Sequence, residues 1–213
     1  MLRRSAKSAF MPDALVFPGG RVEREDAEHA GAQLAEDALP PDAAFARAAQ
    51  RECIEEASLR VELDALRWFD TWKTPSGESP RRFHARFFLA EIGADEGHDA
   101  VADGEETHAG RWATAAAILD QWRAEAVDLP PPTLSILLGI AADDWRGWLT
   151  RSADEARAPI LPKVTAVEST IQIVMPHDPA YAELPGDSAP APARAHAFPR
   201  RFTRVGKRWM PES

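Results

Sequence analysis

Three glutamates with helical spacing are the residues of this chain best suited to chemistry. Glu52, Glu55 and Glu56 lie in an alanine-rich stretch predicted to be helical over residues 42–59, and at 3.6 residues per turn their carboxylates share one face. Mutual repulsion opposes this arrangement, and Arg51, four residues before Glu55, offers local relief. Mg²⁺ and Mn²⁺ prefer oxygen ligands. The pattern indicates either a metal site or a solvated acidic face, because Glu is common on surface helices.

The residues before the glutamates predict the helix that carries them and a strand and glycine turn upstream of it. The helix follows Pro40-Pro41, and Asp42 is expected as its N-cap. Further upstream, the apolar residues 14–17 predict the end of a strand, and Gly19-Gly20 comes directly after Pro18. Two glycines after a strand allow unusual backbone angles and a close approach of the main chain to a ligand.

A glycine turn followed by an R-E-x-x-E-E helix resembles the Nudix hydrolases. The box of that family reads G-x5-E-x7-R-E-U-x-E-E-x-G-U, where U is a bulky aliphatic residue. Asp26 stands where the family has glutamate, Ser58 replaces the last glycine, and 24 residues separate Asp26 from Arg51 where the family has seven. The matching positions are Gly20, Arg51, Glu52, Glu55, Glu56 and Leu59.

The oversized loop inside the box points to one subgroup. We interpret residues 27–41 as a surface insertion, with one helical turn within residues 30–39. Together with Arg4-Ser5, Phe10-Met11-Pro12 and Val16-Phe17-Pro18-Gly19-Gly20, this insertion resembles Nudix proteins related to the mammalian peroxisomal coenzyme A diphosphatase. The resemblance implies coenzyme A or acyl-coenzyme A as substrate. It leaves open ADP-ribose, NADH or other nucleotides, and a non-catalytic Nudix domain that binds a nucleotide as a sensor.

The resemblance also implies roles for individual residues. The reaction is hydrolysis of a nucleoside diphosphate linked to another moiety, with Mg²⁺ or Mn²⁺ as cofactor. Arg51 would hold the carboxylates in register, and either Glu52 or a loop residue such as Glu106 would accept a proton from the attacking water. Glu105 is the neighbouring alternative to Glu106, and an exposed acidic loop is the plain interpretation of both. The implied metal ligands are Gly20 through its carbonyl, Glu52, Glu55 and Glu56.

For the fold, the resemblance implies the α+β class and the Nudix α/β/α sandwich, a mixed β-sheet between helices. Residues 1–150 would form the Nudix domain, and residues 151–213 a C-terminal extension packed on the same domain. Because the family has one or two strands before the segment that begins at Leu2, either the first hairpin is missing or the natural start lies upstream of Met1. An unpaired central strand would be costly, which favours the upstream start.

Beyond the box, hydrophobic patterns predict further elements. Strands are expected at residues 63–73 and 82–90, forming a hairpin with Phe83, Ala85 and Phe87 on its packed side. Helices are expected at 113–122 and 133–148, the second with a core stripe of Leu134, Leu137, Leu138 and Ala141. Short strands are expected at 160–164 and 170–175, an extended and partly ordered segment at 184–199, and an edge strand at 200–209.

Several other residues have a plain and a sharper interpretation. Arg82, Arg86 and the basic segment 200–209 are either solvated strand residues, which we favour, or contacts to substrate phosphates. Cys53 is interpreted as a small buried residue and not a nucleophile. The spacing of His84, His108 and His177 does not suggest a zinc site, so satisfied or exposed imidazoles are expected.

Composition limits the class of partner. The chain has 213 residues, enough for a sizeable core, and a net charge of −9 that argues against general nucleic-acid binding. A single cysteine excludes an intramolecular disulfide and fits a reducing, cytoplasmic location. No apolar run reaches the roughly 18 residues needed to span a membrane. The expected partner is a small-molecule nucleotide, and the oligomeric state stays open, a dimer included.

Overall fold

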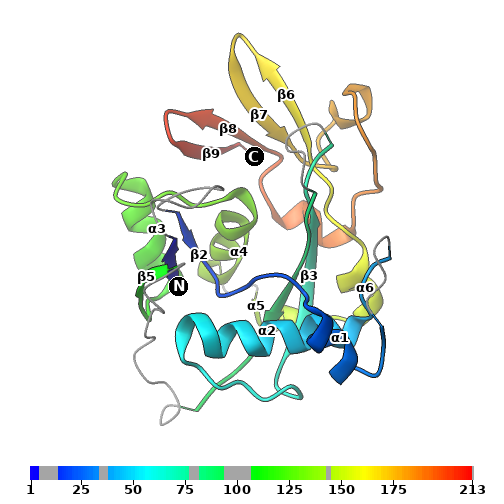
Figure 1. Ribbon diagram of the computed structural model, residues 1–213. Coiled ribbons are helices and arrows are strands. Elements are labelled where there is room, and N and C mark those ends of the chain that lie inside the picture. The colour runs from blue at the N-terminus through cyan, green and yellow to red at the C-terminus, as the bar shows by residue number, and fades with distance from the viewer. Residues whose placement is uncertain (5–13, 34–37, 77–81, 94–106, 143–144, 213) are drawn as a thin grey trace. The chain divides into compact units, whose positions relative to one another are not determined.

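Figure 1 shows the computed structural model of the chain, which describes residues 1–4, 14–33, 38–76, 82–93, 107–142 and 145–212. Internal contacts divide the chain into two compact units. The first comprises Met1–Trp68 and Phe88–Ala113, and the second Phe69–Phe87 and Thr114–Ser213. The proposed boundary of the Nudix domain near residue 150 stays a prediction.

The first unit contains a three-stranded antiparallel sheet. Strand β1, Leu2–Arg4, lies in the centre, with β2, Leu15–Val16, on one side and β5, Thr107–Gly110, on the other. Leu2 and Leu15 are almost fully buried, so they anchor this sheet in the core of the unit. The strand predicted to end near residue 17 is confirmed, and the Gly19-Gly20 turn follows it.

Two helices follow in the same unit, α1 at Arg24–His29 and α2 at Asp42–Ala57. The predicted N-cap is wrong by one residue, because Asp42 is already helical and Pro41 holds the extended cap conformation. The helical turn expected within residues 30–39 includes residues 34–37, which lie outside the described residues, so it stays a prediction. Helix α1 begins earlier, where the backbone N–H of Glu23 donates to the Asp26 carboxylate at 2.8 Å, a bond that favours a helix start at this point.

Helix α2 ends on a residue in the left-handed conformation. Ser58, which occupies the position of the family's last glycine, has φ 55° and ψ 25°, and its N–H donates to the carbonyl of Ile54 at 3.0 Å. A side chain in this conformation costs conformational energy that glycine does not. The C-cap of α2 therefore has the left-handed geometry expected at this position, and the backbone of Ser58 is strained there.

Strands β3, Arg67–Lys73, and β4, His84–Leu89, pair in a two-stranded sheet, which confirms the predicted hairpin. The expected packed side is only partly correct. Phe87 lies 6.5 Å from Phe69 between ring centroids, but Phe83 is 41% exposed, whereas His84 and Arg86 are half-buried. The alternation of residue types here is a poor guide to burial, because long polar side chains can cover apolar surface.

The second unit also contains the remaining helices. They are α3 at Ala115–Arg123, α4 at Pro131–Ala141, α5 at Trp145–Trp148 and α6 at Ala153–Arg157. The predicted helices at 113–122 and 133–148 correspond to α3 and to α4 with α5. The predicted stripe on α4 is confirmed at Leu134 and Leu137, which are buried, whereas Ala141 is exposed.

A four-stranded antiparallel sheet completes this unit, in the order β6-β7-β8-β9. Its strands are Lys163–Val167, Thr170–Val174, Arg201–Val205 and Arg208–Glu212. The basic segment forms a hairpin in place of a single edge strand, because Gly206 with φ 60° allows the turn.

The segment between β7 and β8 is more regular than predicted. It holds two short 3-10 helices, η1 at Tyr181–Glu183 and η2 at Ala193–Ala197. Arg194 in η2 donates to the Asp70 carboxylate on β3 at 2.7 Å, and both side chains are buried. This ion pair fixes η2, which lies in the segment 184–199 that the composition predicts to be only partly ordered.

Candidate active site

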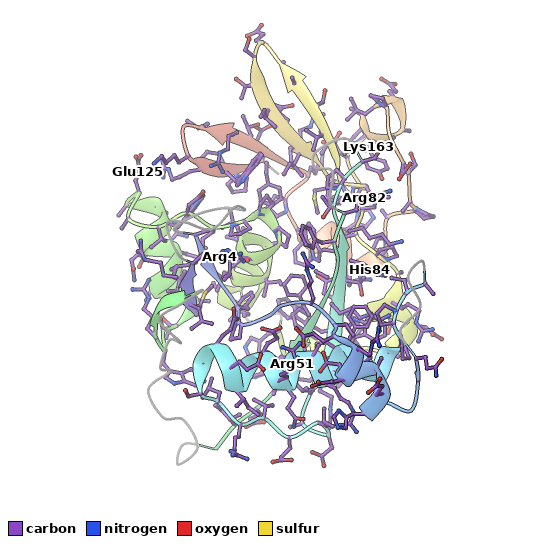
Figure 2. All side chains as sticks on the ribbon, viewed as in Figure 1. Arg4, Arg51, Arg82, His84, Glu125 and Lys163 are labelled. Atoms are coloured by element: carbon purple, nitrogen blue, oxygen red, sulfur yellow. The ribbon has the colours of Figure 1, made fainter. Side chains whose placement is uncertain are left out.

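Arg51 on α2 is the centre of a network of carboxylates in the first unit, and Figure 2 shows its place on that helix. Its Nη1 donates to Oε1 of Glu52 at 2.9 Å and to Oε2 of Glu55 at 2.8 Å. One guanidinium therefore offsets the repulsion between two of the three glutamates. The local relief that the sequence suggests is present in the structure.

Asp26 on α1 holds the other side of the guanidinium. Its carboxylate accepts from Nη2 of Arg51 at 3.0 Å and from Nε at 3.3 Å, and the carbonyl of Arg21 accepts from Nη2 at 2.8 Å. Partial burial lowers the pKa of Arg51, but its hydrogen bonds to Asp26, Glu55 and Glu52 outweigh burial and raise the pKa above the ordinary value. A permanently charged guanidinium with both edges occupied fixes the orientation of this face of α2.

Glu56 connects the acidic helix to the glycine turn. Its side chain is buried, with 8% exposed, and its Oε2 accepts from the backbone N–H of Gly19 at 2.8 Å. The two halves of the box thus meet in space even though the loop between them is enlarged.

Gly20 lies so close to Glu52 that no side chain fits between them. A Cβ built on Gly20 would stand 2.1 Å from Oε1 of Glu52, whereas a Cβ on Gly19 would meet nothing within 4 Å. Neither glycine adopts positive φ. Of the two reasons the sequence offers for glycine here, close approach applies and unusual backbone angles do not.

The donor set suits a hard divalent cation, since the three carboxylates and the Gly20 carbonyl are all oxygen ligands. Their present arrangement is held by hydrogen bonds within the protein. Among the residues that the structure describes, no three His, Cys, Asp or Glu side chains converge as a bound cation requires. Glu55 is 56% exposed, so its carboxylate can turn towards a cation without disturbing the core.

Other predicted residues fall outside this network. Glu106 and its alternative Glu105 lie outside the described residues. Cys53 is half-buried on α2, where burial and then the nearby Glu56 and Glu52 raise its thiol pKa to about 11. A thiol with this pKa is protonated at neutral pH, which fits the interpretation that it is not a nucleophile.

A hollow of about 320 Å³ lies between α1 and α2 and is lined in part by Arg51. Its walls include Arg47 and Ile54 from α2 and His29 from α1. The sequence gives no direct signal for this hollow, because it depends on how α1 packs against α2. Arg47 could have been noted as the residue one helical turn before Arg51.

Four of the basic residues considered for phosphate binding form ion pairs within the second unit. Arg82 pairs with Asp187 at 2.7 Å, Arg201 with Asp178 at 2.6 Å, and Arg208 with Glu125 at 2.6 Å. Arg204 pairs with Asp128 at 3.3 Å and lies over the ring of Trp209. These contacts support the structural interpretation of the basic segment over a clamp on substrate.

A glycine turn apposed to an R-E-x-x-E-E helix is the arrangement expected from the Nudix box. The sequence model of the NUDIX domain matches residues 1–130, so the chain belongs to this family. It is a hydrolase that acts on pyrophosphate bonds.

Two similar proteins accompany this match. A Caenorhabditis elegans protein named "Putative nudix hydrolase 7" is 27% identical over 209 residues, which cover 86% of this chain and 69% of that protein. The crystal structure of a NUDIX hydrolase from Alicyclobacillus acidocaldarius has a TM-score of 0.56 and 23% identity, covering 66% of this chain and 82% of that one. This structural likeness confirms the predicted α+β Nudix fold. Within the described ranges, every helix is too short or too polar to cross a bilayer.

Proposed function

We propose that the protein is a Mg²⁺- or Mn²⁺-dependent diphosphatase whose substrate is coenzyme A or an acyl-coenzyme A. The observation that carries the site assignment is the contact between the two halves of the box. Glu56 accepts from the Gly19 N–H, and Glu52 lies against the Cα side of Gly20. An insertion that disrupted the box would be expected to break both of these contacts.

The residues of the network would divide the work between them. Glu52, Glu55, Glu56 and the Gly20 carbonyl would hold the cation, which would neutralise pyrophosphate charge and lower the pKa of a bound water. Arg51 would keep the carboxylates of Glu52 and Glu55 in register, and Asp26 would keep Arg51 in place. Glu52, or Glu106 from the loop, would accept the proton of the attacking water.

The choice of coenzyme A rests on the sequence resemblance around the box, part of which falls in residues 5–13, outside the described part of the chain. The cleavage would release 3′,5′-ADP and the phosphopantetheine arm. A sensor that only binds a nucleotide is disfavoured by Glu52, Glu55 and Glu56, because three repelling carboxylates reduce helix stability without a cation to hold.

The test is a substrate panel. The full chain with Mg²⁺ is incubated with coenzyme A, acetyl-coenzyme A, NADH and ADP-ribose, and released nucleotides are separated by chromatography. We expect 3′,5′-ADP from the two coenzyme A substrates at the highest kcat/KM. Preferred turnover of ADP-ribose or NADH would show that one of these nucleotides, and not coenzyme A, is the substrate of this Nudix hydrolase. Nucleotide binding with no turnover of any compound would favour the sensor.

Glu56→Gln tests the site apart from the substrate. The amide keeps the size of the side chain but removes the charge that would hold a cation. We expect turnover of every substrate to fall at least about a hundredfold, while circular dichroism and the unfolding midpoint show a folded protein. Unchanged turnover would refute the metal role of this residue.

A further inference from the structure

His177, in the turn after β7, has two ring nitrogens in different surroundings. Its Nε2 lies 3.2 Å from the carbonyl oxygen of Phe198. Its Nδ1 is buried and has no hydrogen-bond partner within the described part of the chain. Buried polar atoms usually have a partner, so this nitrogen calls for a physical explanation.

The contact with Phe198 determines which nitrogen carries the proton. A carbonyl oxygen can only accept, so Nε2 must be the N–H donor of the neutral ring. Nδ1 is then the bare nitrogen, with a lone pair in the ring plane. A histidine whose N–H is held by a backbone carbonyl, with a bare nitrogen opposite, has the arrangement found in metal-binding histidines.

The neighbour of this ring is a second histidine. His196 in η2 has its ring centroid 5.1 Å from that of His177, with an angle of 49° between the planes. Two imidazoles bound to one tetrahedral cation at the usual Zn–N distance place their centroids about 5 Å apart. The separation therefore suits a shared cation. It also suits two packed rings, but packing alone leaves the bare Nδ1 unexplained.

Charged side chains around the pair can be accounted for. The Asp178 carboxylate accepts from Arg201 at 2.6 and 2.9 Å and from the N–H of Ala180 at 2.8 Å, so it is committed to the protein. Arg200 is exposed, and its charge acts on His177. Arg200 would weaken cation binding here without blocking it, since an exposed side chain can turn into solvent.

We propose that His177 and His196 form a two-histidine site for a divalent cation that prefers imidazole ligands, with Zn²⁺ as the probe, separate from the carboxylate site on α2. Water would complete the coordination. His196 is exposed on a short 3-10 helix, so its ring can turn to present a nitrogen without disturbing the core. A cation held between the two rings would fasten η2 to the turn after β7.

The experiment is calorimetric titration of the full chain with Zn²⁺ in excess Mg²⁺, which occupies oxygen ligands and binds imidazole poorly. We expect one Zn²⁺ per chain, with affinity reduced at least about tenfold in His196→Ala and in His177→Gln. His29→Ala is the matched control, because His29 is also exposed but lies on α1. The Zn²⁺ affinity of this variant should equal that of the unaltered chain.

A further variant separates a designed site from casual binding. Arg200→Gln removes the nearby positive charge and should tighten Zn²⁺ binding several-fold, an effect that only a cation close to His177 would feel. Co²⁺ in place of Zn²⁺ should give the visible absorption of a tetrahedral site, absent in His196→Ala. Binding of equal strength in His196→Ala and the unaltered chain, or no binding at all, would overturn the proposal.

Discussion

At the scale of single residues, Arg51 is the side chain that links the carboxylates of the candidate site. Its guanidinium contacts Asp26, Glu52 and Glu55 at once. Each of these bonds is weak in isolation because the group is partly exposed to solvent. Their joint effect is geometric, since a planar fork with five donors fixes several oxygens relative to one another.

Replacing Arg51 by lysine should therefore impair turnover while preserving the charge. A single ammonium cannot reach Asp26 and the two glutamates together, and we expect kcat to fall about ten- to a hundredfold with little change in unfolding midpoint. Arg47→Lys, one helical turn earlier, is the control and should keep full kcat. Equal activity of Arg51→Lys and the unaltered chain would show that the fork is dispensable.

Gly20 provides a sharper test of the same site. Its Cβ in Gly20→Ala would stand 2.1 Å from Glu52 Oε1 and push that carboxylate aside. We expect Mg²⁺ affinity, measured from the metal dependence of turnover, to fall about ten- to a hundredfold. Gly19→Ala has open space around its Cβ and should behave as the unaltered chain. If the two variants were equally active, the close approach would have no functional role.

At the scale of elements, α2 ends on a residue poorly suited to its conformation. Ser58→Gly should raise the free energy of unfolding by about 1 kcal/mol, because glycine adopts positive φ without strain. Urea denaturation measures this gain. Ser58→Ala retains a Cβ and should show no such gain, and a destabilised Ser58→Gly would contradict the strain.

Helix α1, at the start of the enlarged loop, is the other element that matters. It delivers Asp26, which precedes the insertion, to Arg51. The two halves of the box could be predicted because their residue types are specific. The position of α1 could not, because an alanine-rich stretch has helical propensity along most of its length and only the Glu23–Asp26 bond sets where the helix starts.

At the scale of the whole molecule, the buried ion pair between Arg194 and Asp70 fastens the segment between β7 and β8 to β3 in the second unit. Asp70 is fully buried, and burial raises the pKa of its carboxyl although Arg194, Trp72 and Thr71 donate to it. Losing Arg194 would remove the guanidinium that hydrogen-bonds to that carboxylate, which is costly in a buried site.

Arg194→Leu should thus lower the free energy of unfolding by about 3–5 kcal/mol, and adding Asp70→Asn should recover part of the loss. Thermal and urea unfolding of the single and double variants measure the coupling. The exposed pair Arg123–Asp120 is the control, and Arg123→Ala should cost less than about 1 kcal/mol. A small effect of Arg194→Leu would mean that the 184–199 segment is held by other contacts.

The amino-acid sequence by itself determined the family, the acidic helix and its glycine turn, because helical spacing places Glu52, Glu55 and Glu56 on one face whatever surrounds them. It also indicated most strands and helices from their periodicity. Only the tertiary structure decided that Asp26 reaches Arg51, that Gly20 must lack a side chain because Glu52 lies against it, and that His177 meets His196. These contacts join residues that are far apart in the chain. The sequence pattern around each residue therefore cannot predict which distant residue it will contact.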